Sequence, residues 1–196
     1  MDSVEQKYMI LTNDFKEHLH CSKITSYRKK CASKLSGRIL DCGGGVGSFL
    51  PFFKGEVVVL DRELAALQTL KHNQRVMADA EHLPFADNSF DYVWACAVCQ
   101  YLHLEYFIAE AKRVTRIGGE IWILVPNANS PWDRLKSMLG METWRDQVGI
   151  VRQYSVDDLK KHGELTGEIQ FLPMESLLRR FPRWGHTLML VIKKES

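Results

Sequence analysis

Residues 39–47, which read ILDCGGGVG, combine an apolar run with one acid and four glycines. Glycines allow positive φ angles and let a ligand come close to the backbone, because they carry no Cβ. The spacing is D-x-G-x-G-x-G. It is not the G-x-G-x-x-G of dinucleotide-binding loops, since Ser48 stands where the third glycine would fall, and no Gly-Lys-Ser/Thr of a P-loop follows. An acid two residues before the first glycine suits a ligand with positive charge better than a pyrophosphate.

Two further acids stand at or just after the ends of apolar runs. Asp61 closes the run VVVLD at 57–61, and Asp79 comes shortly after a weaker run at 75–77. In an open parallel sheet, ligands bind beyond the carboxyl ends of the strands, near the point where the strand order reverses. We therefore expect these acids to share one edge of the sheet with the glycine-rich loop.

The runs that carry these acids belong to an alternation of short apolar and helix-length segments. Candidate strands cover residues 38–42, 57–60, 75–77, 92–95 and 121–125, and candidate helices cover residues 46–53, 63–72 and 105–115. Apolar strands without a polar–apolar alternation indicate a sheet that is covered on both faces. The pattern therefore predicts an α/β protein with a parallel sheet and right-handed crossovers.

Both ends of the chain depart from this alternation. The expected elements there are a helical region over 3–35 whose second piece, 26–35, stops at Ser36-Gly37, a polar and irregular stretch over 127–154, a helix that ends at Gly163, and closing strands at 167–172 and 187–192. Glycine is the usual helix terminator. Ser155 and Asp158 form a near capping box at the start of the late helix.

Residues 38–127 resemble the class I S-adenosylmethionine-dependent methyltransferases, of the small-molecule, UbiE-like (methyltransferase-11) type. Five motifs carry the resemblance in the family's order: D-x-G-x-G-x-G at 41–47, an acid at 61, D-A-E-H-L-P-F at 79–85, N-S-F-D-Y-V at 88–93 and A-K-R-V-T-R-I-G-G at 111–119. Two positions depart from the pattern, Arg62 in place of an apolar residue and Ile117 in place of a proline. Residues 95–98 also lack the N-P-P-Y-like tetrad of enzymes that methylate amino groups of nucleobases.

The resemblance implies a fold and a division of the chain. The fold would be a Rossmann-like, doubly wound, seven-stranded and mostly parallel sheet with an antiparallel last strand, plus an N-terminal helical cap. Residues 1–35 would form the cap and residues 36–196 the S-adenosylmethionine-binding domain, in which 127–154 is a variable insertion on the substrate side.

The resemblance also implies how the cofactor, S-adenosylmethionine, is held. Asp61 would accept hydrogen bonds from the ribose, because a carboxylate can accept from two adjacent hydroxyls at once. Asp79 would accept from the adenine amino group, with the Ala80 backbone at the ring edge. Arg62 could stack on the base or ion-pair with Glu63 or Asp61, and both alternatives stay open. The expected cofactor-binding set is Asp41, Gly43, Gly44, Gly45, Gly47, Asp61, Arg62, Asp79, Ala80, Ala95 and Cys96.

Three side chains near the expected site could act as a general base: Tyr101, His103 and Tyr154. A base is needed only if the nucleophile still carries its proton at the moment of attack. Each of the three also reads as an ordinary packing residue, so no catalytic base is assigned. Cys96 and Cys99 have CxxC spacing, but no second ligand pair accompanies them, and we expect no metal site.

The methyl acceptor would be chosen by the helical cap and the insertion. Asn127 and Trp132 fall just beyond the fifth strand and could face the substrate. The rings of Trp132, Trp144 and Tyr154 suggest an apolar or aromatic pocket, although they would equally serve to anchor the insertion to the sheet.

Composition narrows the classes of partner. The chain has 196 residues, 45% of them hydrophobic, and a formal net charge of +2, which are globular values. This charge argues against a nucleic-acid duplex as substrate, while the basic residues between 23 and 38 keep RNA or an acidic metabolite open. No apolar stretch approaches the roughly 20 residues of a membrane span, and the first residues lack a secretion signal. The expectation is a soluble, cytoplasmic monomer or homodimer.

The sequence therefore predicts an enzyme that transfers a methyl group from S-adenosylmethionine to a small-molecule or lipid-like acceptor by in-line displacement. Two alternatives come from other classes. One is a nicotinamide-dependent oxidoreductase on the same sheet, and the other is a non-catalytic cofactor-binding scaffold.

Overall fold

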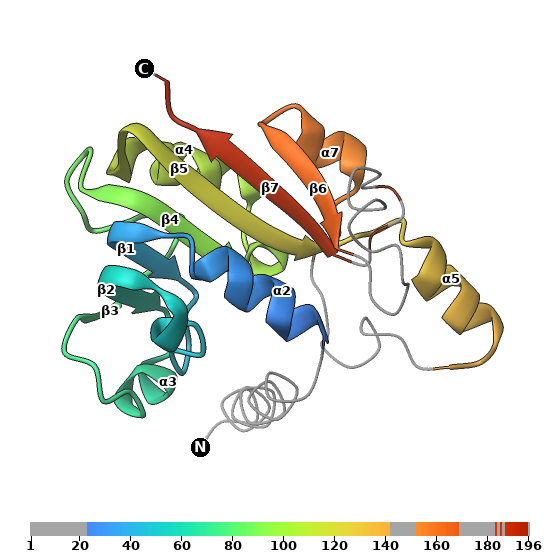
Figure 1. Ribbon diagram of the computed structural model, residues 1–196, viewed down its shortest axis with the longest axis horizontal. Coiled ribbons are helices and arrows are strands. Elements are labelled where there is room, and N and C mark those ends of the chain that lie inside the picture. Colours follow the sequence, from blue (N-terminus) through green and yellow to red (C-terminus); the bar gives the residue numbers. More distant parts are fainter. Residues whose placement is uncertain (1–22, 142–151, 169–182, 184, 186, 196) are drawn as a thin grey trace.

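The computed structural model describes residues 23–141, 152–168, 183, 185 and 187–195 (Figure 1). The strands are β1 (Ser36–Cys42), β2 (Lys54–Asp61), β3 (Arg75–Met77), β4 (Phe90–Cys96), β5 (Thr115–Pro126), β6 (Glu164–Glu168) and β7 (Thr187–Lys193). The helices are α2 (Lys23–Ala32), α3 (Leu64–Gln68), α4 (Leu104–Val114), α5 (Pro131–Met138) and α7 (Val156–Lys160), with short 3₁₀ turns at Leu50–Phe52 and Cys99–Tyr101.

The strands form one seven-stranded sheet in the order β3-β2-β1-β4-β5-β7-β6. All pairs from β3 to β5 are parallel, and β7 runs antiparallel to both of its neighbours, β5 and β6. The strand order reverses between β1 and β4, which places a crevice at their carboxyl ends. The Rossmann-like, mostly parallel sheet with an antiparallel last strand is therefore confirmed.

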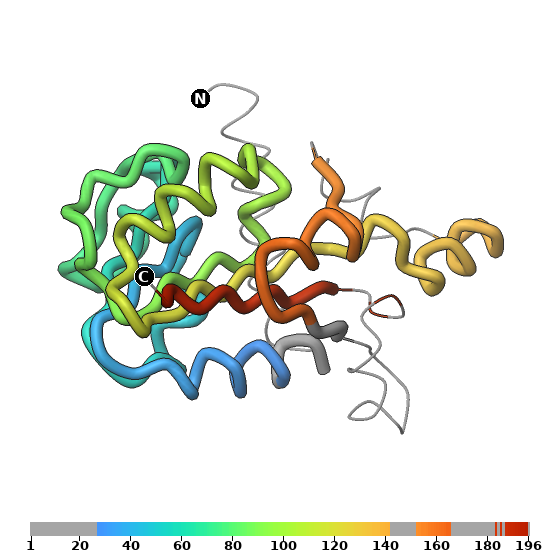
Figure 2. Tube along the Cα trace, turned by 90° about the horizontal axis from the view of Figure 1, so that it is seen from above, coloured from blue at the N-terminus to red at the C-terminus, as the bar shows by residue number. Residues whose placement is uncertain are grey.

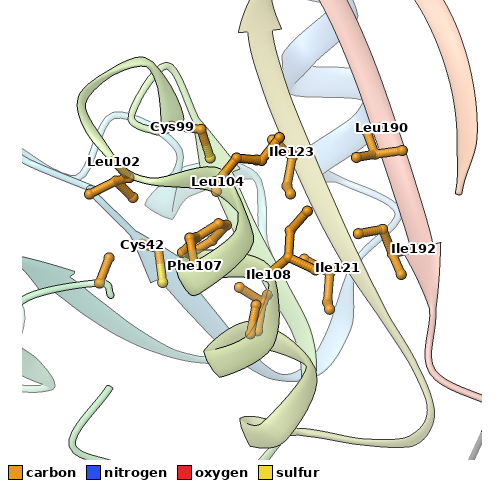
Figure 3. Packing of buried hydrophobic residues seen from close by; sticks show 14 of the residues in the cluster. Cys42, Cys99, Leu102, Leu104, Phe107, Ile108, Ile121, Ile123, Leu190 and Ile192 are labelled. Atoms are coloured by element: carbon orange, nitrogen blue, oxygen red, sulfur yellow. The ribbon is translucent and has the colours of Figure 1, made fainter. Parts of the chain in front are cut away.

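Helices cover both faces of the sheet, α2 on one side and α4 on the other (Figure 2). Alternate residues of a strand point to opposite faces. Leu40 of β1 accordingly packs in the cluster under α4, while Ile39 packs in the cluster under α2. Figure 3 shows Phe107 and Ile108 of α4 beside the buried side chains of β5 and β7. Burial on both faces explains why the strands read as continuous apolar runs.

The prediction of a helix over residues 46–53 is wrong. A series of turns takes its place, followed by the three-residue 3₁₀ turn Leu50–Phe52. Gly45 and Gly47 have φ angles of +52° and +71°, which a right-handed helix does not allow. Gly47 donates to the Gly44 carbonyl at 2.8 Å, so the glycines form turns instead of a helix start. Backbone N–H groups of a first helix are consequently not part of this site.

Other expected elements differ in length. The helix expected at 63–72 is only α3, whose last turn tightens because Thr69 N–H donates to the Ala66 carbonyl. The strand expected at 121–125 begins six residues earlier, at Thr115. The strand expected at 167–172 is β6, which starts at Glu164, and residues 169–172 lie outside the described part. The capping box is confirmed, since the side chain of Ser155 accepts from Asp158 N–H and Asp158 accepts from Ser155 N–H.

The expected cap and insertion are described only in part. Residues 1–22 and 142–151, with Trp144, lie outside the described residues. Cys31 and Ala32 of α2 and the following Leu35 pack in the core of the sheet. Helix α5 projects from the body of the molecule, and none of its residues is buried by the described part of the chain (Figures 1 and 2). Within the described ranges, no helix has the length and apolarity to cross a membrane.

Candidate functional site

The glycine-rich loop is fastened to the end of β2. Gly43 and Gly44 N–H both donate to the carbonyl oxygen of Leu60, at 2.7 and 3.2 Å. Gly43 has φ +67°, and a Cβ at this position would lie 2.4 Å from Cγ2 of Val98, beyond the end of β4. The loop therefore occupies the crevice between β2, β1 and β4, and only glycine fits it there.

Asp61, the last residue of β2, binds this loop through its side chain. The residue is only 3% exposed, and its carboxylate accepts from Gly45 N–H at 2.8 Å and from Glu63 N–H at 3.0 Å. Burial raises the pKa of Asp61 above its ordinary value, although the backbone N–H groups act in the opposite direction. Each carboxylate oxygen has a second lone pair, so Asp61 can still accept from hydroxyl groups of a ligand.

Asp41 lies beside Asp61 and is even more buried, at 2% exposed. Its Oδ2 atom has no hydrogen-bond partner among the described residues. Burial, and then the negative charge of Asp61, raise the pKa of Asp41 to about 7. A Cβ on Gly44 would lie 2.7 Å from this Oδ2 and 2.7 Å from Cγ1 of Val59, so the loop crosses directly over the carboxylate. Two buried acids side by side favour a ligand that brings positive charge.

The end of β3 brings a third acid to the same edge. Ala78 N–H donates to the Asp61 carbonyl at 3.1 Å, so Asp79 follows immediately beside the end of β2. The Asp79 side chain is exposed, and its Oδ1 accepts from Glu81 N–H at 2.8 Å. Ala80 is buried. The structure thus brings together the three acids that the sequence predicts at one edge of the sheet.

Arg62 extends from the edge of this site with its side chain 69% exposed. Its Nε lies 3.5 Å from Oε1 of Glu63, which is one of the two alternatives that the sequence leaves open. Because the side chain is exposed, this ion pair contributes little stability and leaves the guanidinium plane available to a ligand.

The end of β4 carries two residues that sequence reasoning missed. Ala97 has φ +59°, a left-handed conformation that non-glycine residues rarely adopt. Gln100 is 1% exposed; its Nε2 donates to the Ala97 carbonyl at 2.7 Å, and its Oε1 lacks a partner in the described part of the chain. Ala95 and Cys96, from the predicted set, are buried just before them. Nothing in the sequence marks an alanine that adopts a positive φ angle. A glutamine within an apolar segment is a weak sequence signal for a functional residue.

The three candidate bases do not converge on the glycine-rich loop. The Nδ1 of His103 lies 3.2 Å from the Glu81 carboxylate, and its Nε2 lies 2.7 Å from Nη2 of Arg152. The hydroxyl of Tyr154 donates to the Leu102 carbonyl at 2.9 Å. Both residues line a shallow groove of about 480 Å³ between α4 and α7.

Tyr101 is the candidate whose phenol feels the charge of Arg62. Burial raises the pKa of its phenol, while the positive charge of Arg62 is close enough to act in the opposite direction. A phenol with a raised pKa keeps its proton at neutral pH, so Tyr101 can donate a hydrogen bond there but is a poor base.

The structure also describes Asn127, which the sequence places beyond the fifth strand, and the cysteines with CxxC spacing. The Asn127 amide donates to the Gly185 carbonyl at 2.8 Å and its Oδ1 accepts from Asn129 N–H, so this side chain holds the backbone. Cys96 and Cys99 are both buried, and burial raises the pKa of the Cys99 thiol. Over the part of the chain that the structure covers, no cluster of three His, Cys, Asp or Glu could hold a metal ion.

This sheet order is that of a Rossmann-like fold, and the glycine-rich turn and the acids lie at the carboxyl ends of β1, β2 and β3, where such sheets bind ligands. The family model that matches residues 40–123 is described as a methyltransferase domain. The chain belongs to the class I S-adenosylmethionine-dependent methyltransferases and is an enzyme of that family. This membership also sets aside the nicotinamide-dependent alternative.

Known proteins are similar to this chain over different lengths. An uncharacterised protein of Methanocaldococcus jannaschii is 31% identical over 171 residues, which cover 85% of this chain and 73% of the relative. The ubiquinone/menaquinone biosynthesis C-methyltransferase UbiE of Dinoroseobacter shibae is 31% identical over 62% of this chain, and the match spans only 55% of that relative. A SAM-dependent methyltransferase structure from Thermotoga maritima superposes with a TM-score of 0.70 at 16% identity, covering 96% of this chain and 98% of that one.

Proposed function

We propose that this protein transfers the methyl group of S-adenosylmethionine to a small-molecule or lipid-like acceptor by in-line displacement. The observation that carries the proposal is the hydrogen bond from Gly45 N–H to Asp61, with Asp41 buried beside them. It fastens the glycine-rich loop to Asp61, and Asp41 beside them completes a cradle of one loop and two acids. The UbiE relative, a C-methyltransferase of quinone biosynthesis, supports a small or lipid-like acceptor.

The cradle fits an adenosyl sulfonium in its charge. In this proposal Asp61 accepts from the ribose hydroxyls, and Asp79 accepts from the adenine amino group with Ala80 at the ring edge. The unpartnered oxygen of Asp41 suits the positively charged end of the cofactor. We propose the whole predicted set as binding residues: Asp41, Gly43, Gly44, Gly45, Gly47, Asp61, Arg62, Asp79, Ala80, Ala95 and Cys96.

The cofactor supplies a methyl group that is already electrophilic. The protein has to align the nucleophile with the methyl–sulfur bond and exclude water, and such alignment can lower a barrier by about 7–11 kcal/mol. We assign this task to the end of β4, where Gln100 holds the Ala97 carbonyl and the Val98 side chain lies against Gly43.

Neither His103 nor Tyr154 is proposed as the base. Both ring nitrogens of His103 are engaged, and the Tyr154 hydroxyl is bound to a backbone carbonyl. The reaction then calls for an acceptor whose nucleophile already has a free electron pair at the moment of attack, such as a stabilised carbanion or a neutral amine. We also propose that the expected cap, 1–35, and the insertion, 127–154, select this acceptor, while 36–196 binds the cofactor.

Calorimetry and methyl transfer test the proposal in two steps. Titration with S-adenosylmethionine, S-adenosylhomocysteine and NAD should give saturable binding of the first two ligands only. Incubation with methyl-tritiated cofactor should then label a demethylated quinol or another small organic acceptor in preference to RNA. Binding of NAD alone would overturn the cofactor assignment. Cofactor binding with label only on RNA would overturn the acceptor class.

A further inference from the structure

The segment from Asp79 to Asp87 carries the proposed adenine contacts but belongs to no helix or strand. It runs through turns and irregular backbone between β3 and β4. A segment without a ladder of backbone hydrogen bonds must satisfy its N–H and C=O groups with other partners. Helix α4 supplies several of these partners.

Arg113, in the last turn of α4, makes the densest set of contacts with this segment. Its Nη2 donates to the Leu83 carbonyl at 2.8 Å, and its Nη1 donates to the Phe85 carbonyl at 2.7 Å. Nη1 also lies 2.9 Å from the carboxylate of Asp87. A guanidinium is a planar fork with fixed donor directions, so these contacts determine the path of the segment and not only its charge balance.

Glu110 completes the arrangement one turn earlier in α4. Its carboxylate accepts from Nε and Nη2 of Arg113, at 2.8 and 2.9 Å, and its Oε2 also accepts from Leu83 N–H at 2.8 Å. The bonds from Arg113 lower the pKa of Glu110, which keeps it ionised at neutral pH. Both backbone groups of Leu83 are therefore held by one Glu–Arg pair.

A second anchor holds the same segment at the other end of α4. Glu81 accepts from the backbone N–H of His103 at 2.5 Å and from its ring Nδ1 at 3.2 Å. Asp79 in turn accepts from Glu81 N–H. The orientation of Asp79 is thus linked to α4 through Glu81, and the backbone that follows it is linked to α4 through Arg113.

We propose that Glu110 and Arg113 are positioning residues for the adenine-binding segment. This inference rests on the proposed function, because it assigns the pair a role through Asp79 and Ala80. Other side chains of α4 pack in the core: Phe107, Ile108, Ala111 and Val114. The Arg113 and Glu110 side chains are instead partly exposed, at 32% and 23%.

The test compares Arg113→Lys with the wild-type protein in calorimetric titrations. One ligand is S-adenosylhomocysteine and the other is its hypoxanthine analogue, S-inosylhomocysteine, which lacks the amino group that Asp79 would read. Lysine keeps the charge but loses the fork, so affinity for S-adenosylhomocysteine should fall about tenfold, the size of one charged hydrogen bond. The preference for adenine over hypoxanthine should shrink by a similar factor. Glu110→Gln should behave in the same direction.

Lys161→Ala is the matched control. It removes an ion pair to Glu105 of α4 with the same 2.8 Å contact, but Glu105 does not touch the adenine-binding segment. This variant should keep both affinities. If Arg113→Lys and Glu110→Gln melt within a few degrees of the wild type, bind equally tightly and still prefer adenine, the positioning role is wrong. If the variants lose affinity for S-adenosylhomocysteine and for S-inosylhomocysteine by the same factor, the Glu110–Arg113 pair has only a structural role. If the wild-type protein binds neither ligand, the proposed function itself fails.

Discussion

At the scale of single residues, the main feature of the site is a pair of buried acids that lie side by side. Asp41 and Asp61 both have a raised pKa, and burial is the larger cause in each case. They differ in their partners within the described chain: Asp61 accepts two backbone N–H groups, whereas Oδ2 of Asp41 accepts none. We infer that Asp61 organises the loop and that Asp41 carries the unbalanced charge.

The first prediction follows from the pKa of Asp41, which rises from 3.8 in the unfolded chain to about 7 in the folded protein. Between these values the folded state retains a proton that the unfolded state has released. The contribution of Asp41 to stability therefore falls as the pH rises from about 4 to about 7, by at most about 4 kcal/mol. Asp41→Asn should be more stable than the wild type at pH 8 and gain much less at pH 5, as measured by urea unfolding. Parallel pH profiles for the two proteins would contradict this.

The second prediction concerns Asp61. Asp61→Ala removes the proposed ribose acceptor and also leaves Gly45 and Glu63 N–H without their carboxylate. Loss of two charged hydrogen bonds to a ligand should weaken cofactor binding by at least about 100-fold. Asp61→Asn, which keeps one acceptor oxygen, should fall between the alanine variant and the wild type in calorimetry. Unchanged affinity in the alanine variant would show that the ribose assignment is wrong.

The sequence alone predicts which acids lie close together, but it does not predict the contacts that their side chains make. The positions of Asp41, Asp61 and Asp79 at strand ends are readable, because parallel strands end at one edge of the sheet. The isolation of the Asp41 carboxylate and the engagement of both His103 nitrogens are not readable. They depend on Gly44 and on Arg152, residues whose contacts are fixed only by the tertiary fold.

At the scale of elements, the glycine-rich loop shows where sequence patterns fail. Apolar residues from Val46 to Phe53 have helical spacing, which predicts a helix, yet the preceding glycines adopt positive φ angles and the chain turns repeatedly. Local propensity is overridden here by the fit of the loop over Asp41. The capping box of α7 is the opposite case, since Ser155 and Asp158 need only each other and the nearby backbone.

The third prediction uses the variant Gly44→Ala to test how closely this loop packs over Asp41. The new Cβ would lie 2.7 Å from both the Asp41 carboxylate and the Val59 side chain, and both are buried. Overpacking of this kind costs about 1–3 kcal/mol, and it should also displace the loop and weaken cofactor binding. Thermal melting and calorimetry would measure the two effects.

Gly140→Ala provides the comparison for that variant. Gly140 has φ +66°, and a Cβ at this position would have no atom of the described residues within 4 Å, so the change adds backbone strain without a clash. It should lower stability by about 1 kcal/mol and leave cofactor affinity unchanged. Equal loss of affinity in the two variants would show that the space above Asp41 is not part of the site.

At the scale of the whole molecule, the class of fold follows from the sequence but the strand order does not. Alternating apolar runs and helices predict a covered parallel sheet, because each strand must bury both faces. Hydrophobic patterns do not record which strands are neighbours. The family resemblance implies an antiparallel last strand, but the placement of β7 between β5 and β6 is given only by the structure. The edge strand β3 is the weakest of the expected strands, and it is three residues long in the structure.

The last prediction treats the protein as one folding unit coupled to its ligand. A ligand that binds only the folded state at 100 times its Kd stabilises the protein by about 2.7 kcal/mol. For a chain of this size, each kcal/mol corresponds to about 2–4 °C in Tm, so S-adenosylhomocysteine should raise Tm by roughly 5–11 °C. NAD at the same concentration should not shift it, because Ser48 interrupts the dinucleotide pattern. A shift with S-adenosylhomocysteine that persists in Asp61→Ala would place the ligand outside the cradle of Asp41, Asp61 and the glycine-rich loop.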